Sequence, residues 1–115
     1  PPELAQIIAD DSRPIFVATD TDSTLLGYAF CMDENHAGAN NLQPVRTLYI
    51  DDLCVDEACR GKHVGQALYD HTVAYARRIG CRTVTLNVWC GNDSALHFYE
   101  KQGLKPRNIH METVL

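Results

Sequence analysis

Alternating apolar and polar positions predict a series of short strands along this chain. Two apolar runs, residues 15–19 and 25–32, flank the turn-forming residues 20–23, which predicts a β-hairpin. A later run, residues 47–55, is apolar apart from Asp51 and Asp52. All the strands together are predicted at residues 15–19, 25–32, 47–55, 81–88 and 109–115.

Helical spacing of apolar positions predicts three helices. Residues 3–9 have helical composition and are followed by a breaking run that contains a proline. Apolar residues then recur from residue 64 to residue 79, and Gly80 is the expected end of that helix. The run Asn92-Asp93-Ser94 is a strong N-cap signal for a last helix, which ends at about Gln102.

The order of these elements predicts an α/β (α+β) fold with a mixed central sheet. The hairpin implies antiparallel pairing at the N-terminal end, and the strand–helix–strand unit from residue 47 to residue 88 implies a right-handed crossover between parallel strands. We therefore expect a β-α-β-α-β core with helices on both faces of the sheet. Residues 33–44 are expected to form the one long loop.

Composition narrows the functional class. The chain has 115 residues with 45% hydrophobic content, which predicts a single domain over residues 1–115. A net charge of −5 argues against a nucleic-acid partner, and no apolar run has membrane-spanning length. Five cysteines without a C-x-x-C pair favour reduced thiols in the cytoplasm and no metal site. Because the chain begins Pro1-Pro2, we expect an N-terminally truncated fragment.

A basic, glycine-containing loop joins the strand at residues 47–55 to the following helix. Its backbone N–H groups converge at the positive end of the helix dipole, a favourable place for a phosphate. Gly61 and Gly65 let a ligand approach the backbone closely, and Arg60 and Lys62 add positive charge. The loop therefore predicts a site for a phosphate-bearing cofactor.

Two motifs resemble those of the GNAT (Gcn5-related N-acetyltransferase) superfamily. The run Arg60-Gly61-Lys62-His63-Val64-Gly65 is similar to its motif A, R/Q-x-x-G-x-G/A, with His63 where the middle glycine is usual. The second motif resembles N…N…A-x-x-F-Y-E-K-x-G-F, and its residues here are Asn87, Asn92, Ala95, Phe98, Tyr99, Glu100, Lys101, Gly103 and Leu104. The resemblance is strongest over residues 48–106.

The resemblance implies acetyl-coenzyme A (acetyl-CoA) as co-substrate, with no metal. Backbone groups at the start of the helix would hold its pyrophosphate, and the backbone of Leu53, Cys54 and Val55 would pair with the pantetheine arm like an added strand. The arm would enter where the strands ending at Val55 and Val88 separate. The remaining implied contacts are Arg60, Gly61, Lys62, His63, Val64, Gly65, Gln66, Asn87, Asn92, Ala95, Tyr99 and Lys101.

The catalytic residues implied by the resemblance are a tyrosine and an acid. Tyr99 matches the family's general acid, which protonates the departing thiolate. Asp51 and Asp52 are the candidate bases, and strand alternation predicts that they lie on opposite faces. The run from Leu48 to Leu53 resembles the L-Y-x-E-D-[LF] strand of polyamine-type acetyltransferases, where Asp51 replaces the glutamate near the acceptor amine. Because Asp is one methylene shorter, a bridging water is expected.

These features favour an N-acetyltransferase that acts on a primary amine of a small molecule. Two alternatives stay open: a non-catalytic CoA-binding or scaffold module, and a peptide or protein N-acetyltransferase. A homodimer would also be consistent with the family. The sequence predicts a packing role for His71, a role in packing or in a pocket wall for Tyr28, and an inert thiol for Cys54.

Overall fold

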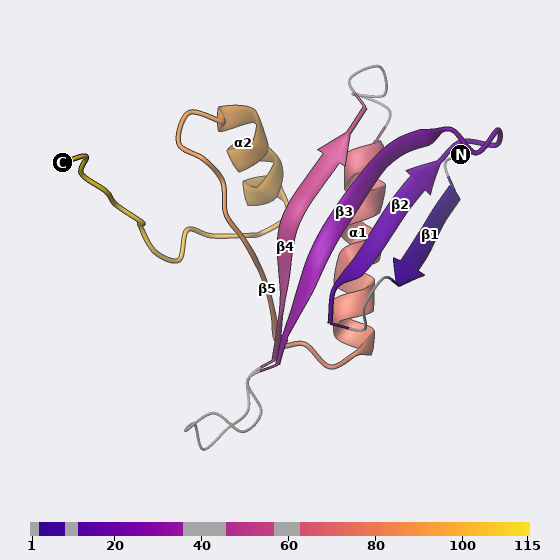
Figure 1. Ribbon diagram of the computed structural model, residues 1–115, viewed down its shortest axis with the longest axis horizontal. Helices are drawn as coiled ribbons and strands as arrows, with labels where there is room; N and C mark the ends of the chain where they lie inside the picture. The colour runs from indigo at the N-terminus through magenta and orange to yellow at the C-terminus, as the bar shows by residue number, and fades with distance from the viewer. Residues whose placement is uncertain (1–2, 9–11, 36–45, 57–62) are drawn as a thin grey trace.

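The computed structural model describes residues 3–8, 12–35, 46–56 and 63–115, which fold around one mixed sheet (Figure 1). Its strands lie side by side in chain order: β1 (Glu3–Ile8), β2 (Pro14–Thr19), β3 (Leu25–Asn35), β4 (Arg46–Val55) and β5 (Thr83–Leu86). The strands from β1 to β4 pair antiparallel with one another, and β5 is parallel to β4. The predicted hairpin and the parallel strand pair are both confirmed.

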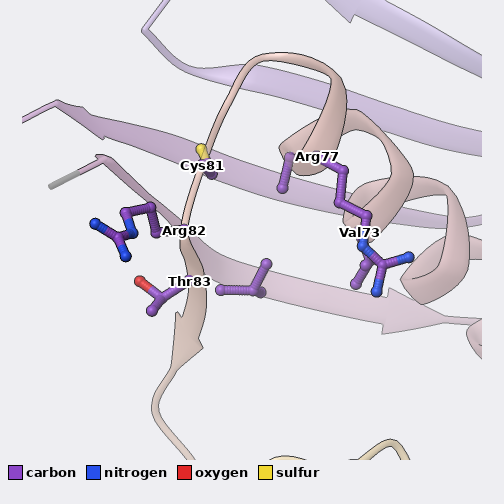
Figure 2. Close-up of a pocket in the computed structure, with 7 residues that line it drawn as sticks. Val73, Arg77, Cys81, Arg82 and Thr83 are labelled. Carbon is purple, nitrogen blue, oxygen red and sulfur yellow. The ribbon is translucent and has the colours of Figure 1, made fainter.

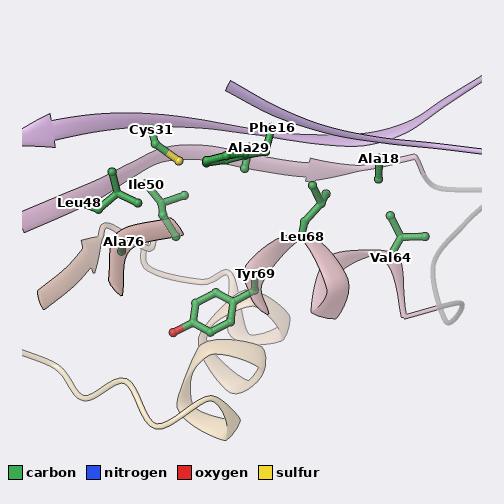
Figure 3. Packing of buried hydrophobic residues seen from close by; sticks show 10 residues of the cluster. All are labelled: Phe16, Ala18, Ala29, Cys31, Leu48, Ile50, Val64, Leu68, Tyr69 and Ala76. Atoms are coloured by element: carbon green, nitrogen blue, oxygen red, sulfur yellow. The ribbon is translucent and has the colours of Figure 1, made fainter. Parts of the chain in front are cut away.

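Helix α1 (Val64–Arg78) connects β4 to β5 and covers one face of the sheet. Buried side chains of the strands meet α1 in a continuous core, as Figure 3 shows. Phe16, Leu48 and Leu68 are fully buried there. The His71 ring packs edge-on against Phe16 with centroids 5.0 Å apart, and burial lowers the His71 pKa, so the ring is neutral and structural.

The second helix, α2 (Asp93–Lys101), packs antiparallel against the first half of α1. Tyr69 of α1 contacts the rings of Phe98 and Tyr99, with centroids 6.2 Å and 6.1 Å apart. The side-chain amides of Gln66 and Gln102 donate to each other at 2.7 Å and 2.8 Å. No described helix covers the sheet face opposite α1, where Phe30 is 40% exposed.

Two expected elements have a different structure. The predicted helix at residues 3–9 is wrong, because this segment forms β1 and pairs along its length with β2, from Glu3–Thr19 to Ile8–Pro14. An isolated helix of seven residues is marginal, and cross-strand pairing overrides its composition. The predicted strand at residues 109–115 is also wrong: this segment extends away from the sheet (Figure 1), and Ile109 is 84% exposed. An alternating pattern forms a strand only beside a partner.

Arg46 holds the sheet together at the end remote from the glycine-containing loop. Its guanidinium donates to Asp33 of β3 and to the carbonyl of Ile79, just after α1. Its own carbonyl accepts from the N–H of Arg82, 2.8 Å away. These contacts keep the start of β4 paired with the start of β5. The two strands separate towards their C-terminal ends, beyond Ile50 and Leu86.

A β-bulge at Asp51 interrupts β4. Phe30 of β3 pairs with Asp52, whereas the next residue, Cys31, pairs with Ile50, so Asp51 has no partner of its own. The bulge shifts the alternation by one residue. Ile50 and Leu53 would lie on opposite faces of a regular strand, yet both pack against the core.

Gly27 is required where β3 passes under α1. A β-carbon at this position would lie 2.7 Å from the carbonyl oxygen of Cys54 and 3.0 Å from Cδ1 of Leu68. We expect Gly27→Ala to lower the free energy of unfolding by about 1–3 kcal/mol, because backbone atoms would have to move. Urea unfolding of this variant measures the loss, and an unchanged midpoint would show that β3 shifts freely.

Candidate active site

Beyond the bulge, β4 and β5 separate. Their parallel ladder runs from Thr47–Thr83 to Ile50–Leu86 and stops there, while β4 continues to Val55. In the described part of the chain, no strand pairs with residues 51–55 on the side that β5 has left. The backbone there is available to a ligand that adds as a further strand, and β5 ends at Leu86, two residues earlier than expected.

The first turn of α1 lies beside Val55, the last residue of β4. The chain enters it through His63, whose φ of 61° and ψ of 20° lie in the left-handed region that favours glycine. The N–H groups of this first turn have no acceptor within the helix, so they are suited to bind an anion. Arg60, Gly61 and Lys62 lie outside the described residues.

Packing does not explain why residue 65, in this turn, is a glycine. A β-carbon there would lie 3.5 Å from Cγ2 of Val55 and 4.0 Å from Cζ of Phe98, which are ordinary van der Waals contacts. The fold would therefore accept alanine at this position. The glycine keeps the backbone bare between β4 and α1, as close approach of a phosphate-bearing group requires.

Tyr99 lies half-buried on α2, between the two helices. Its ring contacts Phe98 with centroids 5.2 Å apart, in addition to Tyr69. Burial is the main cause that raises the Tyr99 pKa, followed by the charges of Tyr69 and Asp52. The hydroxyl therefore stays protonated at neutral pH and can donate a proton to a stronger base.

The two aspartates of β4 differ in their surroundings, although both are exposed. The Tyr28 hydroxyl donates to Oδ2 of Asp52 at 3.1 Å, and this bond is the largest cause that raises the Tyr28 pKa to about 12. The Asp51 side chain has no hydrogen-bond partner among the residues described. The expectation of opposite faces assumed regular alternation, which the bulge interrupts at this point.

Other expected contact residues already have partners within the protein. Asn92 caps α2 by accepting from the N–H of Ala95, 3.3 Å away, and Asn87 donates to the Tyr49 hydroxyl at 3.1 Å. The side-chain amide of Gln66 is bound to Asp70 and Gln102, which leaves its backbone N–H for a ligand. Lys101 lies exposed in the last turn of α2, roughly 14 Å along the helix from Asn92.

The structure thus brings the end of β4, the first turn of α1 and α2 together where Gly65 lies near Val55 and Phe98. Leu53 and Tyr99 both pack against the core. Cys54 is exposed and pairs with Tyr28 across the strands. The Tyr28–Asp52 hydrogen bond could not be predicted from the sequence, because it depends on the register between β3 and β4.

A shallow cavity lies elsewhere, between α1 and β5 (Figure 2). Its lining includes Arg77, Cys81 and Thr83, at the C-terminal end of α1. Arg77 is roughly 18 Å along the helix from Gly65, so this cavity is separate from the candidate site. Among the described residues, no cluster of three or more His, Cys, Asp or Glu side chains could hold a metal ion. None of the described helices could span a membrane.

Comparison with known families decides the class of this fold. The sequence profile of the acetyltransferase (GNAT) family matches residues 1–104. This chain belongs to the GNAT family. The match covers β4, α1, β5 and α2, the elements that surround the opening.

Relatives of this GNAT chain include named acetyltransferases. It is 29% identical to mycothiol acetyltransferase of Propionibacterium freudenreichii, over 89% of the chain and 34% of that protein. It is 33% identical to streptothricin acetyltransferase of Streptomyces lavendulae, over 81% of the chain and 44% of that protein. The chain therefore spans less than half the length of either.

Solved structures agree on the fold. A variant of the BH1408 protein from Bacillus halodurans superposes with a TM-score of 0.85 at 26% identity, over 94% of this chain and 69% of that one. The mixed α+β architecture expected from the sequence is confirmed, and the family match makes it a GNAT fold.

Proposed function

We propose that this GNAT protein transfers the acetyl group of acetyl-CoA directly to a primary amine of a small molecule. The observation that carries the proposal is the half-buried Tyr99 on α2, whose pKa is raised by burial and also by the charge of Asp52, on the part of β4 that β5 does not pair with. Relatives named for mycothiol and streptothricin support a small-molecule acceptor. We also propose that the protein is cytoplasmic.

The residues present fit acetyl-CoA. The first-turn N–H groups of α1 and the bare backbone at Gly65 would receive the pyrophosphate. The backbone of Leu53, Cys54 and Val55 would pair with the pantetheine arm, and one of its N–H groups would stabilise the oxyanion. Bound acetyl-CoA supplies a thioester, the acyl donor.

Side chains of the protein donate and accept the protons in the proposed reaction. The neutral amine nitrogen attacks the thioester carbonyl carbon, and the carbon–sulfur bond breaks. Tyr99 gives its proton to the departing thiolate and is reprotonated from solvent. Asp51, whose side chain has no partner in the described structure, takes the proton of the attacking amine through a bridging water.

A thiol-release assay tests the proposal. Acetyl-CoA is offered to the protein with a panel of small primary amines, and we expect amine-dependent release of free CoA thiol together with the acetylated amine by mass spectrometry. Binding of acetyl-CoA without turnover on any small amine or peptide would overturn catalysis and support the CoA-binding module. Turnover on peptides alone would move the acceptor to proteins.

A further inference from the structure

The segment that follows α2 is extended and carries exposed apolar side chains. Every residue from 105 to 115 is exposed, and Figure 1 shows this segment projecting away from the sheet. Its large apolar side chains are each more than 80% exposed: Ile109, Met111, Val114 and Leu115. So much apolar surface within seven residues is typical of a segment that docks against another protein surface.

Strand β5 has a free edge that can accept a further strand. It pairs with β4 from Thr47–Thr83 to Ile50–Leu86, and no strand in the described part of the chain pairs with its other side. The unpaired N–H and C=O groups of an edge strand are a template for another chain. Because residues 109–115 extend away from β5 (Figure 1), the edge stays open to a second molecule.

A groove runs along α1 beside this edge. One shallow cavity lies between α1 and β5 (Figure 2), a second lies beside α1 near Gln102, and both are lined by Val73 and Arg77. We call the two together the β5 groove. Val73 and Val84 give it apolar surface, whereas Arg77 and Arg82 form no ion pair with any residue that the structure describes. The groove is therefore suited to an extended segment with apolar side chains and a negative charge.

Residues 109–115 have these properties. In a strand, Ile109, Met111 and Leu115 would share one face, so that they could enter the β5 groove together. Glu112 is the one acidic residue of the segment, and its charge is opposite to that of Arg82, which directly precedes β5. The segment and the groove are thus complementary in both hydrophobicity and charge.

We propose that residues 109–115 of one copy add as a further strand to the free edge of β5 in a second copy. The two copies exchange these segments reciprocally, so the assembly closes as a twofold dimer. The apolar face of each segment covers Val73 and Val84 of the other copy. The dimer needs no bound acetyl-CoA, so this inference stands apart from the proposed function.

Sedimentation equilibrium of the full chain tests the proposal. We expect a dimer, and Met111→Glu should raise its dissociation constant at least tenfold, because a charge would enter the apolar groove. Since Met111 is exposed within the single chain, the variant should fold, which circular dichroism checks. Leu25→Glu is the matched control: it also replaces an exposed large apolar side chain, at the start of β3, and should leave the dissociation constant unchanged.

Hydrogen exchange at β5 distinguishes the exchanged segment from any other dimer contact. The amides of Thr83–Leu86 that do not bond to β4 should be protected above the dissociation constant and exchange freely below it. A chain that is monomeric at every concentration, or a dimer of equal affinity in Met111→Glu, would overturn the proposal. Protection that persists in the dilute monomer would also overturn it, because the segment would then pair with β5 of its own copy.

Discussion

Replacing Tyr99 with phenylalanine is expected to lower kcat about 10²-fold or more, with little change in acetyl-CoA affinity. The substitution keeps the ring contacts with Tyr69 and Phe98, so the packing of α2 on α1 should survive. Only the proton donor is lost, and the departing thiolate must then be protonated by water. Steady-state kinetics and acetyl-CoA calorimetry on the same preparation separate the two effects.

The matched control for Tyr99 is Tyr75→Phe. Tyr75 lies in the second half of α1, with its ring 5.1 Å from that of Phe16, and its hydroxyl takes no part in the proposed reaction. Its removal should leave kcat unchanged. If Tyr99→Phe and Tyr75→Phe have the same rate as wild type, Tyr99 is not the general acid.

The pH profile gives a second readout of the same residue. Because burial raises the Tyr99 pKa above its ordinary value of 10, the acid form persists throughout the neutral range. Loss of kcat from Tyr99 ionisation is therefore expected only above pH 10, and this limb should be absent in Tyr99→Phe.

Filling the space at Gly65 is expected to weaken acetyl-CoA binding strongly. Gly65→Trp would place a large side chain between Val55 and the first turn of α1, where the pyrophosphate is proposed to bind. We expect the dissociation constant to rise at least 10²-fold, equivalent to about 2.7 kcal/mol. Calorimetry measures the affinity, and thermal unfolding reports whether the fold is retained.

Gly65→Ala separates folding from binding at the same position. Its β-carbon would make only van der Waals contacts, and alanine is favoured over glycine in a helix by about 0.5–1 kcal/mol. The variant should therefore be at least as stable as wild type and yet bind acetyl-CoA more weakly. Undiminished affinity in a folded Gly65→Trp would exclude this turn as the pyrophosphate site.

The elements that the sequence predicted well are those whose signals are local. The N-cap at Asn92 and the end of α1 before Gly80 depend on side chains and backbone preferences within one turn. The apolar periodicity of α1 and of β2 is likewise a property of the segment itself. The first segment failed because its strand pairing with residues 14–19 has no counterpart in its own composition.

The candidate site also combines features with local sequence signals and features that depend on contacts between distant segments. The glycine-containing loop and Tyr99 could be singled out as candidates from motif spacing. The bulge at Asp51 could not, because a register shift exists only between two strands. Nor could the hydrogen bonding between Gln66 and Gln102, because these two residues lie 36 positions apart in the sequence.

The sequence by itself determined the family, the order of strands and helices from residue 14 to residue 101, and the candidate site residues. Only the tertiary structure decided which of them meet: it opened the sheet beyond Ile50, placed Tyr99 against Tyr69, and joined Tyr28 to Asp52. The physical reason is that periodicity and capping act within a few residues along the chain. Strand register and helix packing arise between segments that the sequence keeps far apart.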